Sequence, residues 1–270
     1  MRFELFRVKL MLQVMEVFGS ESIGVLRQLS KGASQVEGLP KDMRVKYPTR
    51  LFRYWFMERF FALEISNKKS LSVCEIGIGQ GQLPKLLLTT PSWGKSLLPK
   101  WTGVDCDSDA VNLSGEIYDS ICIADVEAAT FGKFVESSEH QGRYDVVVVL
   151  HFLEHLKNPE IAFQKIVTLL KPGGVIIGGM PCTPECFRAL WEPVIRKKAS
   201  QFGHYSVFSP ARLTNMFQSN ALNAEVLRGG FLLRKKNLFL ENYSWWTRFN
   251  VFFGKLFPSW PGEIYFMARK

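Results

Sequence analysis

The sequence predicts an α/β fold: a doubly wound, mostly parallel seven-stranded sheet with a C-terminal antiparallel hairpin and a helical N-terminal extension. Short apolar runs alternate with helical patterns from residue 71 onward, which is the order of a parallel sheet covered on both faces. A glycine-rich turn, G-I-G-Q-G, joins the first run to the first helical pattern. After residue 180 the alternation stops, and two later apolar runs suit a closing hairpin.

The first 69 residues predict helices rather than strands. Charged residues interrupt the segment 1–18 every few positions, which predicts an amphipathic helix and does not suit a secretory signal. Residues 49–65 are densely aromatic with arginines at helical spacing, so we expect a helix that packs on the sheet edge or covers a substrate pocket. We therefore expect a helical extension or cap at 1–69 and the main domain at 70–270.

Seven strands are expected along the rest of the chain. The fourth, Y-D-V-V-V-V-L, contains an uninterrupted valine run, which indicates a strand buried on both faces. The expected strands are 71–76, 101–105, 120–124, 144–150, 174–180, 223–233 and 263–269.

Helical patterns lie between these strands. Residues 159–170 end before a Lys-Pro-Gly-Gly run, which carries the signals of a helix C-terminus. Residues 210–220 follow Ser209, which suits an N-cap, and begin with a proline at the first helical position. The segment 181–208 is rich in Pro, Arg and Lys, and we expect it to be irregular.

Composition places the chain among globular proteins. It has 270 residues, of which 47% are hydrophobic and 22% charged, ordinary values for that class. No apolar run approaches the roughly 18 residues that a membrane span needs. The five cysteines are an odd number, which argues against a disulfide framework and favours a reducing compartment, so we expect a cytoplasmic location.

The net charge of +9 is distributed unevenly: +6 for residues 1–69, −5 for 70–184 and +8 for 185–270. Basic flanks suit an anionic substrate or an anionic membrane surface. A generally basic surface explains the same numbers, so both interpretations stay open at this point.

The glycine-rich turn distinguishes between two kinds of nucleotide ligand. A dinucleotide fingerprint needs its third glycine three residues after the second, and Gln82 stands there. The third glycine comes one residue early, at Gly81, and an acid, Glu75, precedes the turn. Glycine permits a left-handed backbone and lets a ligand approach without a Cβ in the way.

The pattern E-x-G-x-G-x-G resembles motif I of the class I methyltransferases, which bind S-adenosylmethionine (SAM). The resemblance extends over residues 71–181, with L-E-H after the fourth strand and L-L-K-P-G-G before the fifth. A later segment, G-H-Y-S-V-F-S-P-A-R-L at 203–213, also resembles this family. It implies a Rossmann-like sheet, SAM as cofactor, a SAM-binding core at 71–181 and a substrate-side elaboration at 182–262.

Asp105 ends the second strand, where a carboxylate can accept hydrogen bonds from both ribose hydroxyls of an adenosine. The resemblance implies that Asp125 accepts from the adenine amine and that Val126 packs on the ring. The full set of expected cofactor-binding residues is Glu75, Gly77, Gly79, Gly81, Asp105, Asp125 and Val126.

His151 follows the fourth strand at the end of the sheet where ligands bind, and we predict that it is catalytic, taking a proton from the acceptor. Ubiquinone-type O-methyltransferases and small-RNA 2′-O-methyltransferases have E-x-x-E-H here and use it around a metal ion, whereas this chain has H-x-x-E-H. His151, Glu154 and His155 could still ligate a metal, but we expect none. His155 and His204 are expected on the substrate side.

The segment 238–260 is strongly aromatic, and Trp245 and Trp246 are its candidate substrate-side residues. Such a segment suits a membrane interface or a lid over an apolar or glycolipid acceptor. Packing on the sheet and on the helix at 49–65 explains it equally well.

These observations predict a SAM-dependent methyltransferase that acts on a small-molecule, glycan or lipid-linked acceptor at oxygen. We expect a cytoplasmic protein with peripheral contact to an anionic membrane as an open possibility. Methylation of a nucleic acid is an alternative, but no separate binding module and no P-P-[YFW] signature is present. A SAM-binding-fold partner without catalysis is the other alternative, and the intact motif residues argue against it.

Overall fold

The computed structural model describes residues 20–39, 44–65, 70–90, 93, 100–109, 111, 117–199 and 203–270. The amphipathic helix expected at 1–18 lies outside these residues.

A seven-stranded mixed sheet forms the centre of the molecule, which confirms the predicted fold class. Its order is β3-β2-β1-β4-β5-β7-β6, and only the pairs made by β7 are antiparallel among the pairs described. The strands are β1 (Ser72–Ile76), β2 (Lys100–Asp105), β3 (Ser120–Ile123), β4 (Tyr144–Leu150), β5 (Leu170–Cys182), β6 (Asn223–Gly229) and β7 (Gly262–Arg269).

The strand order reverses between β1 and β4. From β1 the chain runs outward through β2 and β3, then returns to the other side of β1 with β4 and β5. Ligands of open α/β sheets bind at such a switch point, beyond the carboxyl ends of the strands. The segments that follow β1, β2, β3 and β4 therefore define where a site is expected.

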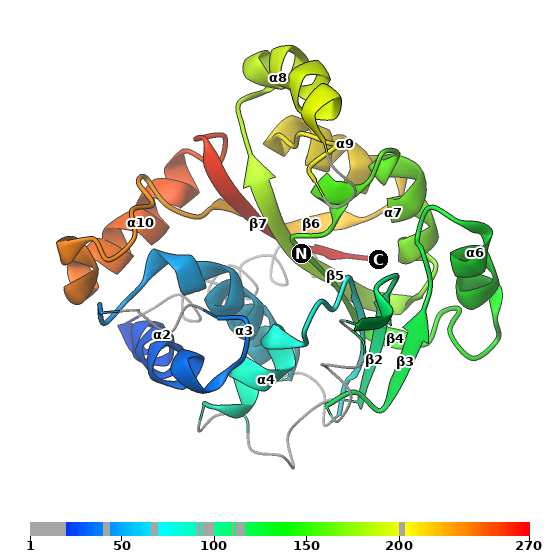
Figure 1. Ribbon diagram of the computed structural model, residues 1–270, viewed down its shortest axis with the longest axis horizontal. Helices are drawn as coiled ribbons and strands as arrows, with labels where there is room; N and C mark the ends of the chain where they lie inside the picture. The colour runs from blue at the N-terminus through cyan, green and yellow to red at the C-terminus, as the bar shows by residue number, and fades with distance from the viewer. Residues whose placement is uncertain are drawn as a thin grey trace, which may run out of the picture.

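One face of the sheet is covered by α2 (Ser20–Gly32), α3 (Phe52–Ile65) and α4 (Gln82–Leu88), which lie together in Figure 1. The helix expected at 49–65 is confirmed, with a 3₁₀ turn, η2 (Thr49–Leu51), leading into α3. Its aromatic side chains are buried against β-strand residues such as Val146 and Ile177 in one continuous core cluster. The indole N–H of Trp55 donates to the carbonyl of Ser22 at 2.8 Å and joins α3 to α2.

The opposite face is covered by α6 (Ala129–Glu136), α7 (Pro159–Val167) and α9 (Pro210–Ser219) (Figure 1). The expected N-cap of α9 is confirmed, because the side chain of Ser209 accepts from the backbone N–H of Arg212 at 3.1 Å. The apolar sides of α6, α7 and α9 form a second core cluster with this face of the sheet.

The prediction of an irregular segment at 181–208 is wrong in its middle part. A 14-residue helix, α8 (Glu185–Lys198), follows β5 directly. Ion pairs at helical spacing stabilise it, because Glu192 accepts from Arg188 at 3.0 Å and from Arg196 at 2.8 Å. No described residue of α8 is buried, so surface ion pairs rather than core packing support this helix.

The aromatic segment 238–260 folds as a 3₁₀ turn, η5 (Phe239–Asn242), and a helix, α10 (Ser244–Leu256). A Cβ added at Gly254 would lie 1.9 Å from the carbonyl oxygen of Gly229, so α10 approaches β6 closely only because a glycine stands there. Within the described residues, no helix is long and apolar enough to cross a bilayer.

Candidate functional site

The glycine-rich turn adopts the left-handed backbone that its composition predicts. Gly77, Gly79 and Gly81 have φ values of 76°, 49° and 67°. The N–H of Gly77 donates to the carbonyl of Val104 at 2.8 Å, which fixes the turn against the end of β2. A Cβ at Gly77 would lie 2.4 Å from the ring of Phe152, so side chains larger than hydrogen are excluded here.

The N-terminal extension lies directly on this turn. Gly38 has a φ of 77°, and a Cβ built on it would lie 2.3 Å from the side-chain oxygen of Gln80 and 2.6 Å from the side-chain nitrogen of Gln82. The extension therefore covers the turn at close range.

Asp105 lies beside the glycine turn at the end of β2. One carboxylate oxygen accepts from the N–H of Gly79 at 2.9 Å, and the other accepts from the N–H of Asp107 at 3.0 Å. These bonds fix the carboxylate in place, and each oxygen keeps a lone pair for a further donor. The arrangement suits a ligand that brings two hydroxyl groups to this point.

Glu75 lies buried beneath the turn, near the end of β1. The hydroxyl of Tyr118 donates to its carboxylate at 2.9 Å. Burial raises the pKa of Glu75 to about 8; the bond from Tyr118 lowers it, and the charge of Asp105 adds to the rise. A buried carboxyl of this kind becomes ionised most easily when a cation arrives beside it.

Asp125 and Val126 follow β3 but differ in exposure. Asp125 is exposed, and its carboxylate accepts from the N–H of Glu127 at 2.9 Å. The side chain of Val126 is buried in the core cluster on the α6 face. The structure thus brings the turn and Asp105 into direct contact, places Glu75 where it senses the charge of Asp105, and places Asp125 on the loop after β3.

His151 has a φ of 50°, which is unusual for a residue with a Cβ and signals local strain. Its ring lies between two carboxylates: Nδ1 is 3.2 Å from Oε1 of Glu154, and Nε2 is 3.6 Å from Oε1 of Glu263. Burial lowers the pKa of His151, but the facing carboxylates of Glu154 and Glu263 outweigh burial and raise the pKa overall.

Three residues beside His151 are absent from the sequence-based prediction: Arg53, Arg234 and Glu263. The guanidinium of Arg53 lies 2.9 Å from Oε1 of Glu263, and the guanidinium of Arg234 and the hydroxyl of Tyr265 also donate to this carboxylate. Glu263 is buried, which raises its pKa, yet His151 and the two arginines hold the pKa well below its usual range. The only sequence signal was an acid opening the apolar run of the last strand.

Glu154, His155 and His204 form a group that could hold a divalent metal ion. One ligand atom from each lies within 4.8 Å of the others. Glu154, in the 3₁₀ turn η4 (Leu153–His155), keeps 1% of its surface exposed. Its carboxylate forms the ion pair with His151 described above, but neither of its oxygens has a hydrogen-bond partner among the described residues. His151 is outside this group, so the ligand set differs from the H-x-x-E-H set considered above. The absence of a metal stays a prediction.

Trp245 and Trp246 occupy the first turn of α10 and are not equivalent. Trp245 is 53% exposed, whereas Trp246 is 7% exposed and stacks on Phe249. Their described ring contacts are with each other and with Phe249, so the structure does not bring them to the histidines.

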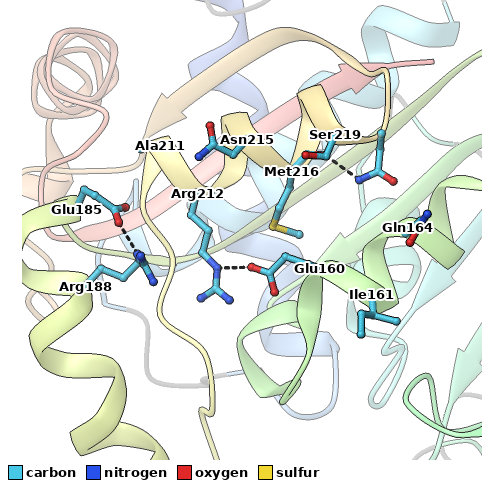
Figure 2. Close-up of a pocket in the computed structure, with 11 residues that line it drawn as sticks. Glu160, Ile161, Gln164, Glu185, Arg188, Ala211, Arg212, Asn215, Met216 and Ser219 are labelled. Atoms are coloured by element: carbon cyan, nitrogen blue, oxygen red, sulfur yellow. Dashed lines mark hydrogen bonds and ion pairs between the residues drawn. The ribbon is translucent and has the colours of Figure 1, made fainter.

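A recess of about 590 Å³ lies away from these residues, between α7, α8 and α9. Figure 2 shows that its charged side chains face one another, with Arg212 paired to Glu160 and Arg188 paired to Glu185, each at 2.7 Å. It contains none of the residues at the carboxyl ends of β1, β2 and β4. The candidate site is therefore the strand-end region, and the recess is a salt-bridged groove between helices.

Comparison with known proteins shows which proteins the chain resembles. The family profile described as "Methyltransferase domain" matches residues 47–233. The chain is 25% identical over 150 residues to a "Ubiquinone biosynthesis O-methyltransferase" of Colwellia psychrerythraea, covering 53% of this chain and 58% of that protein. It is 26% identical over 105 residues to the protein of the same name in Shewanella halifaxensis, covering 37% and 44%. The chain thus matches about half the length of these curated relatives.

Solved structures share the fold. A "SAM dependent methyltransferase" from Archaeoglobus fulgidus superposes with a TM-score of 0.50 at 15% identity, covering 79% of this chain and 92% of that one. At this identity the likeness concerns the fold alone.

Proposed function

The chain belongs to the methyltransferase-domain family, and we propose from this premise that it transfers the methyl group of SAM to an oxygen atom of a small-molecule, glycan or lipid-linked acceptor. When bound, SAM supplies an electrophilic methyl group on a sulfonium ion. The protein's own residues bind and orient the two reactants and remove a proton from the acceptor.

The observation that carries the proposal is the contact between Asp105 and the glycine turn. The carboxylate of Asp105 is held by the N–H of Gly79, with Glu75 buried beside it. Asp105 suits the ribose hydroxyls, and Glu75 suits a cation, so the pair fits a ligand that has both. We propose Asp125 for the adenine amine, since it lies on the loop after β3.

Two observations support oxygen as the acceptor atom. His151 directly follows β4, the strand beside β1, and there an imidazole can take the proton of a hydroxyl as its oxygen attacks. The relatives described above are named O-methyltransferases of ubiquinone biosynthesis, which supports a small acceptor with a hydroxyl group. We propose His155 and His204 as further lining of this side.

Replacement of Asp105 tests the cofactor assignment. Asp105→Ala removes two charged acceptors, so we expect SAM binding to weaken by about 1.5–3 kcal/mol, the scale of hydrogen bonds to charged groups. Calorimetry with SAM should detect this loss, and Asp107→Ala, two residues away and exposed, serves as the matched control with little change. Tight binding of NAD with none of SAM would overturn the proposed function. Binding of SAM without turnover on any acceptor would favour a non-catalytic partner.

We also propose that the protein contacts an anionic membrane peripherally through α10. Trp245, Phe249, Phe252 and Leu256 follow one side of this helix at helical spacing and are exposed. Arg248 and Lys255 flank the stripe and are also exposed. Exposed aromatics with nearby cations suit the interface of an anionic bilayer.

The helix α8 supports the same orientation of the molecule. Phe187, Leu190, Trp191 and Val194 are exposed along it. α8 follows the carboxyl end of β5 at Cys182, and α10 precedes the start of β7 at Gly262. Cys182 and Gly262 are partners in the sheet, so both helices are attached at the same end of the strands. A membrane against this end would bring a lipid-linked acceptor to the strand ends that carry His151.

A further inference from the structure

We propose that Arg53 and Arg234 form a binding site for a carboxylate group of the methyl acceptor, with Glu263 as the residue that positions both arginines. This inference rests on the proposed function and narrows its acceptor to hydroxy acids. None of the three residues follows from the glycine-turn motif, and they come from three distant parts of the chain.

The two arginines are partly exposed, whereas the carboxylate that they share is buried. Arg53 and Arg234 keep 22% and 35% of their side chains exposed, whereas Glu263 keeps 4%. Each guanidinium has five N–H donors, and the described bonds to Glu263 use one nitrogen from each. The Nε of Arg53 is buried and has no hydrogen-bond partner among the described residues. Both guanidinium groups therefore keep N–H donors that Glu263 does not use.

Glu263 holds the two guanidinium groups in fixed positions. It accepts from Arg53 on α3, from Arg234 after β6 and from Tyr265 on its own strand. A fork of N–H groups that is already fixed loses less conformational entropy on binding a planar carboxylate than a free arginine does.

The charge count favours a monoanion. Arg53 and Arg234 contribute two positive charges and Glu263 one negative charge, while the nearby His151 is paired with Glu154. The group therefore keeps one positive charge that no member compensates, on two partly exposed guanidinium groups. One carboxylate would neutralise it, whereas a phosphate dianion would leave a surplus negative charge beside Glu263.

The arginines lie close enough to His151, the proposed base, for one small molecule to contact both. Oε1 of Glu263 is 2.9 Å from Nη2 of Arg53 and 3.6 Å from Nε2 of His151. The Nε2 atom is itself buried without a hydrogen-bond partner among the described residues. An acceptor held by its carboxylate on the arginines could therefore present a hydroxyl to His151, which makes the arginines specificity-determining residues rather than catalytic ones.

The test uses the full chain saturated with S-adenosylhomocysteine and three probes: 4-hydroxybenzoate, its neutral amide and 4-hydroxyphenyl phosphate. We expect calorimetry or ligand-detected NMR to show that the benzoate binds about tenfold more tightly than the amide, the ratio that one charge-assisted hydrogen bond provides. Arg234→Gln should reduce this ratio to about one, and Arg53→Lys should reduce it partly, since a lysine keeps the charge without the fork.

Lys235→Gln is the matched control, because Lys235 is the next residue and is exposed. It should leave the ratio unchanged, and thermal unfolding should show that all variants are folded. Equal binding of benzoate and amide by the native chain would overturn the proposal, as would an equal loss in Lys235→Gln or tighter binding of the phosphate. Calorimetry with SAM in the same variants reports the cofactor site separately, so a failure of the proposed function is recognised independently.

Discussion

His151 combines a strained backbone with a side chain held between two carboxylates. A φ of 50° is unfavourable for most residues that have a Cβ. The backbone strain therefore lies at the residue that we propose removes the proton of the acceptor. Glu154 and Glu263 raise the pKa of the imidazole, and this makes it a stronger base that is charged up to a higher pH. Its activity as a base should therefore depend on pH above the usual range of histidine.

Replacing His151 tests this role. Native turnover should rise with pH through an inflection above about 6.5, the ordinary pKa of histidine, because only the neutral ring accepts a proton. We expect His151→Gln to lower turnover by roughly 100-fold or more, the scale of general base catalysis, and to abolish the inflection. Calorimetry should show nearly unchanged affinity for SAM.

Equal turnover of native and variant protein from about pH 6 to about pH 9 would assign His151 a purely structural role. Treatment with a chelator tests whether the group Glu154, His155 and His204 holds a metal ion that turnover needs. We expect the chelator to leave turnover unchanged. Loss of activity with chelator and recovery with added divalent ion would instead place a metal in that group.

Glu75 should release a proton when SAM binds. The pKa of its buried carboxyl is raised to about 8, and the positive charges of SAM favour the ionised form. Calorimetry near pH 7 in two buffers of different ionisation enthalpy should report release of about one proton, and the affinity should rise with pH toward about 8. Glu75→Gln should abolish the release and flatten the affinity profile.

Without SAM the same carboxyl gives a check of opposite sign. A group with a pKa near 4.5 when unfolded and about 8 when folded binds its proton more tightly in the folded state. The free energy of unfolding therefore falls as pH rises through this window, and Glu75→Gln should remove that fall. Parallel stability curves for native and variant protein would contradict the raised pKa.

The sequence predicted the left-handed glycine turn after the first strand and Asp105 at the end of the second, because each follows from residues that lie close together along the chain. Glu75 and the three glycines form one continuous motif, and Asp105 ends the next strand. Their assignment to SAM stays a prediction. The acceptor-side group could not be found in this way, because Arg53, Arg234 and Glu263 meet only after α3 and β7 have packed on the same part of the sheet. No local pattern connects them.

At the scale of the element, α8 and α10 show where pattern reasoning fails. Pro193 and the many basic residues argued against a helix in α8, but the charges at positions 185, 188, 192 and 196 pair along one side of it. In α10 the aromatic residues divide between two roles. Trp246 is buried against its neighbours, while Trp245 and Phe252 remain exposed.

The exposed side of α10 should determine membrane binding. We expect Trp245→Ser/Phe252→Ser to reduce sedimentation with vesicles of anionic lipid by roughly tenfold or more, because two large apolar side chains leave the interface. Trp246 is unsuitable for this test, since it is buried and its loss would damage the fold. Binding to neutral vesicles should be weaker, and salt should reduce binding to the anionic ones.

Ile161→Ser provides the control, because Ile161 is exposed on α7, on the other face of the sheet. It should bind vesicles as the native protein does. If the α10 variant also binds as well as the native protein, or if nothing binds at low salt, α10 has another role.

For the whole molecule, Arg269 joins the N-terminal extension to the C-terminal hairpin. Its guanidinium lies 2.5 Å from Glu64 at the end of α3 and 2.5 Å from Glu225 on β6, and both carboxylates are almost fully buried. These contacts lie at the amino end of β6 and the carboxyl end of β7, away from Arg53, Arg234 and Glu263. Arg269 thus contributes to stability without touching the site.

Arg269→Met should leave two buried carboxylates without a partner and cost on the order of 3 kcal/mol of unfolding free energy, because uncompensated buried charge is strongly destabilising. Chemical denaturation measures this loss. Arg188→Ala removes partly exposed ion pairs on α8 and should change the unfolding free energy by less than about 1 kcal/mol. A similar small change for Arg269→Met would show that the buried contacts are not essential.

The position of β7 also sets the order in which the molecule can assemble. The only described strand partner of β6 is β7, and β7 follows β6 in the sequence while pairing in turn with β5. During synthesis β6 therefore leaves the ribosome before β7, the strand that connects it to the sheet. Until β7 is synthesised, the backbone N–H and C=O groups of β6 lack their strand partners. Glu263 arrives with β7, so a nascent chain can complete its glycine turn well before the two arginines acquire their common carboxylate.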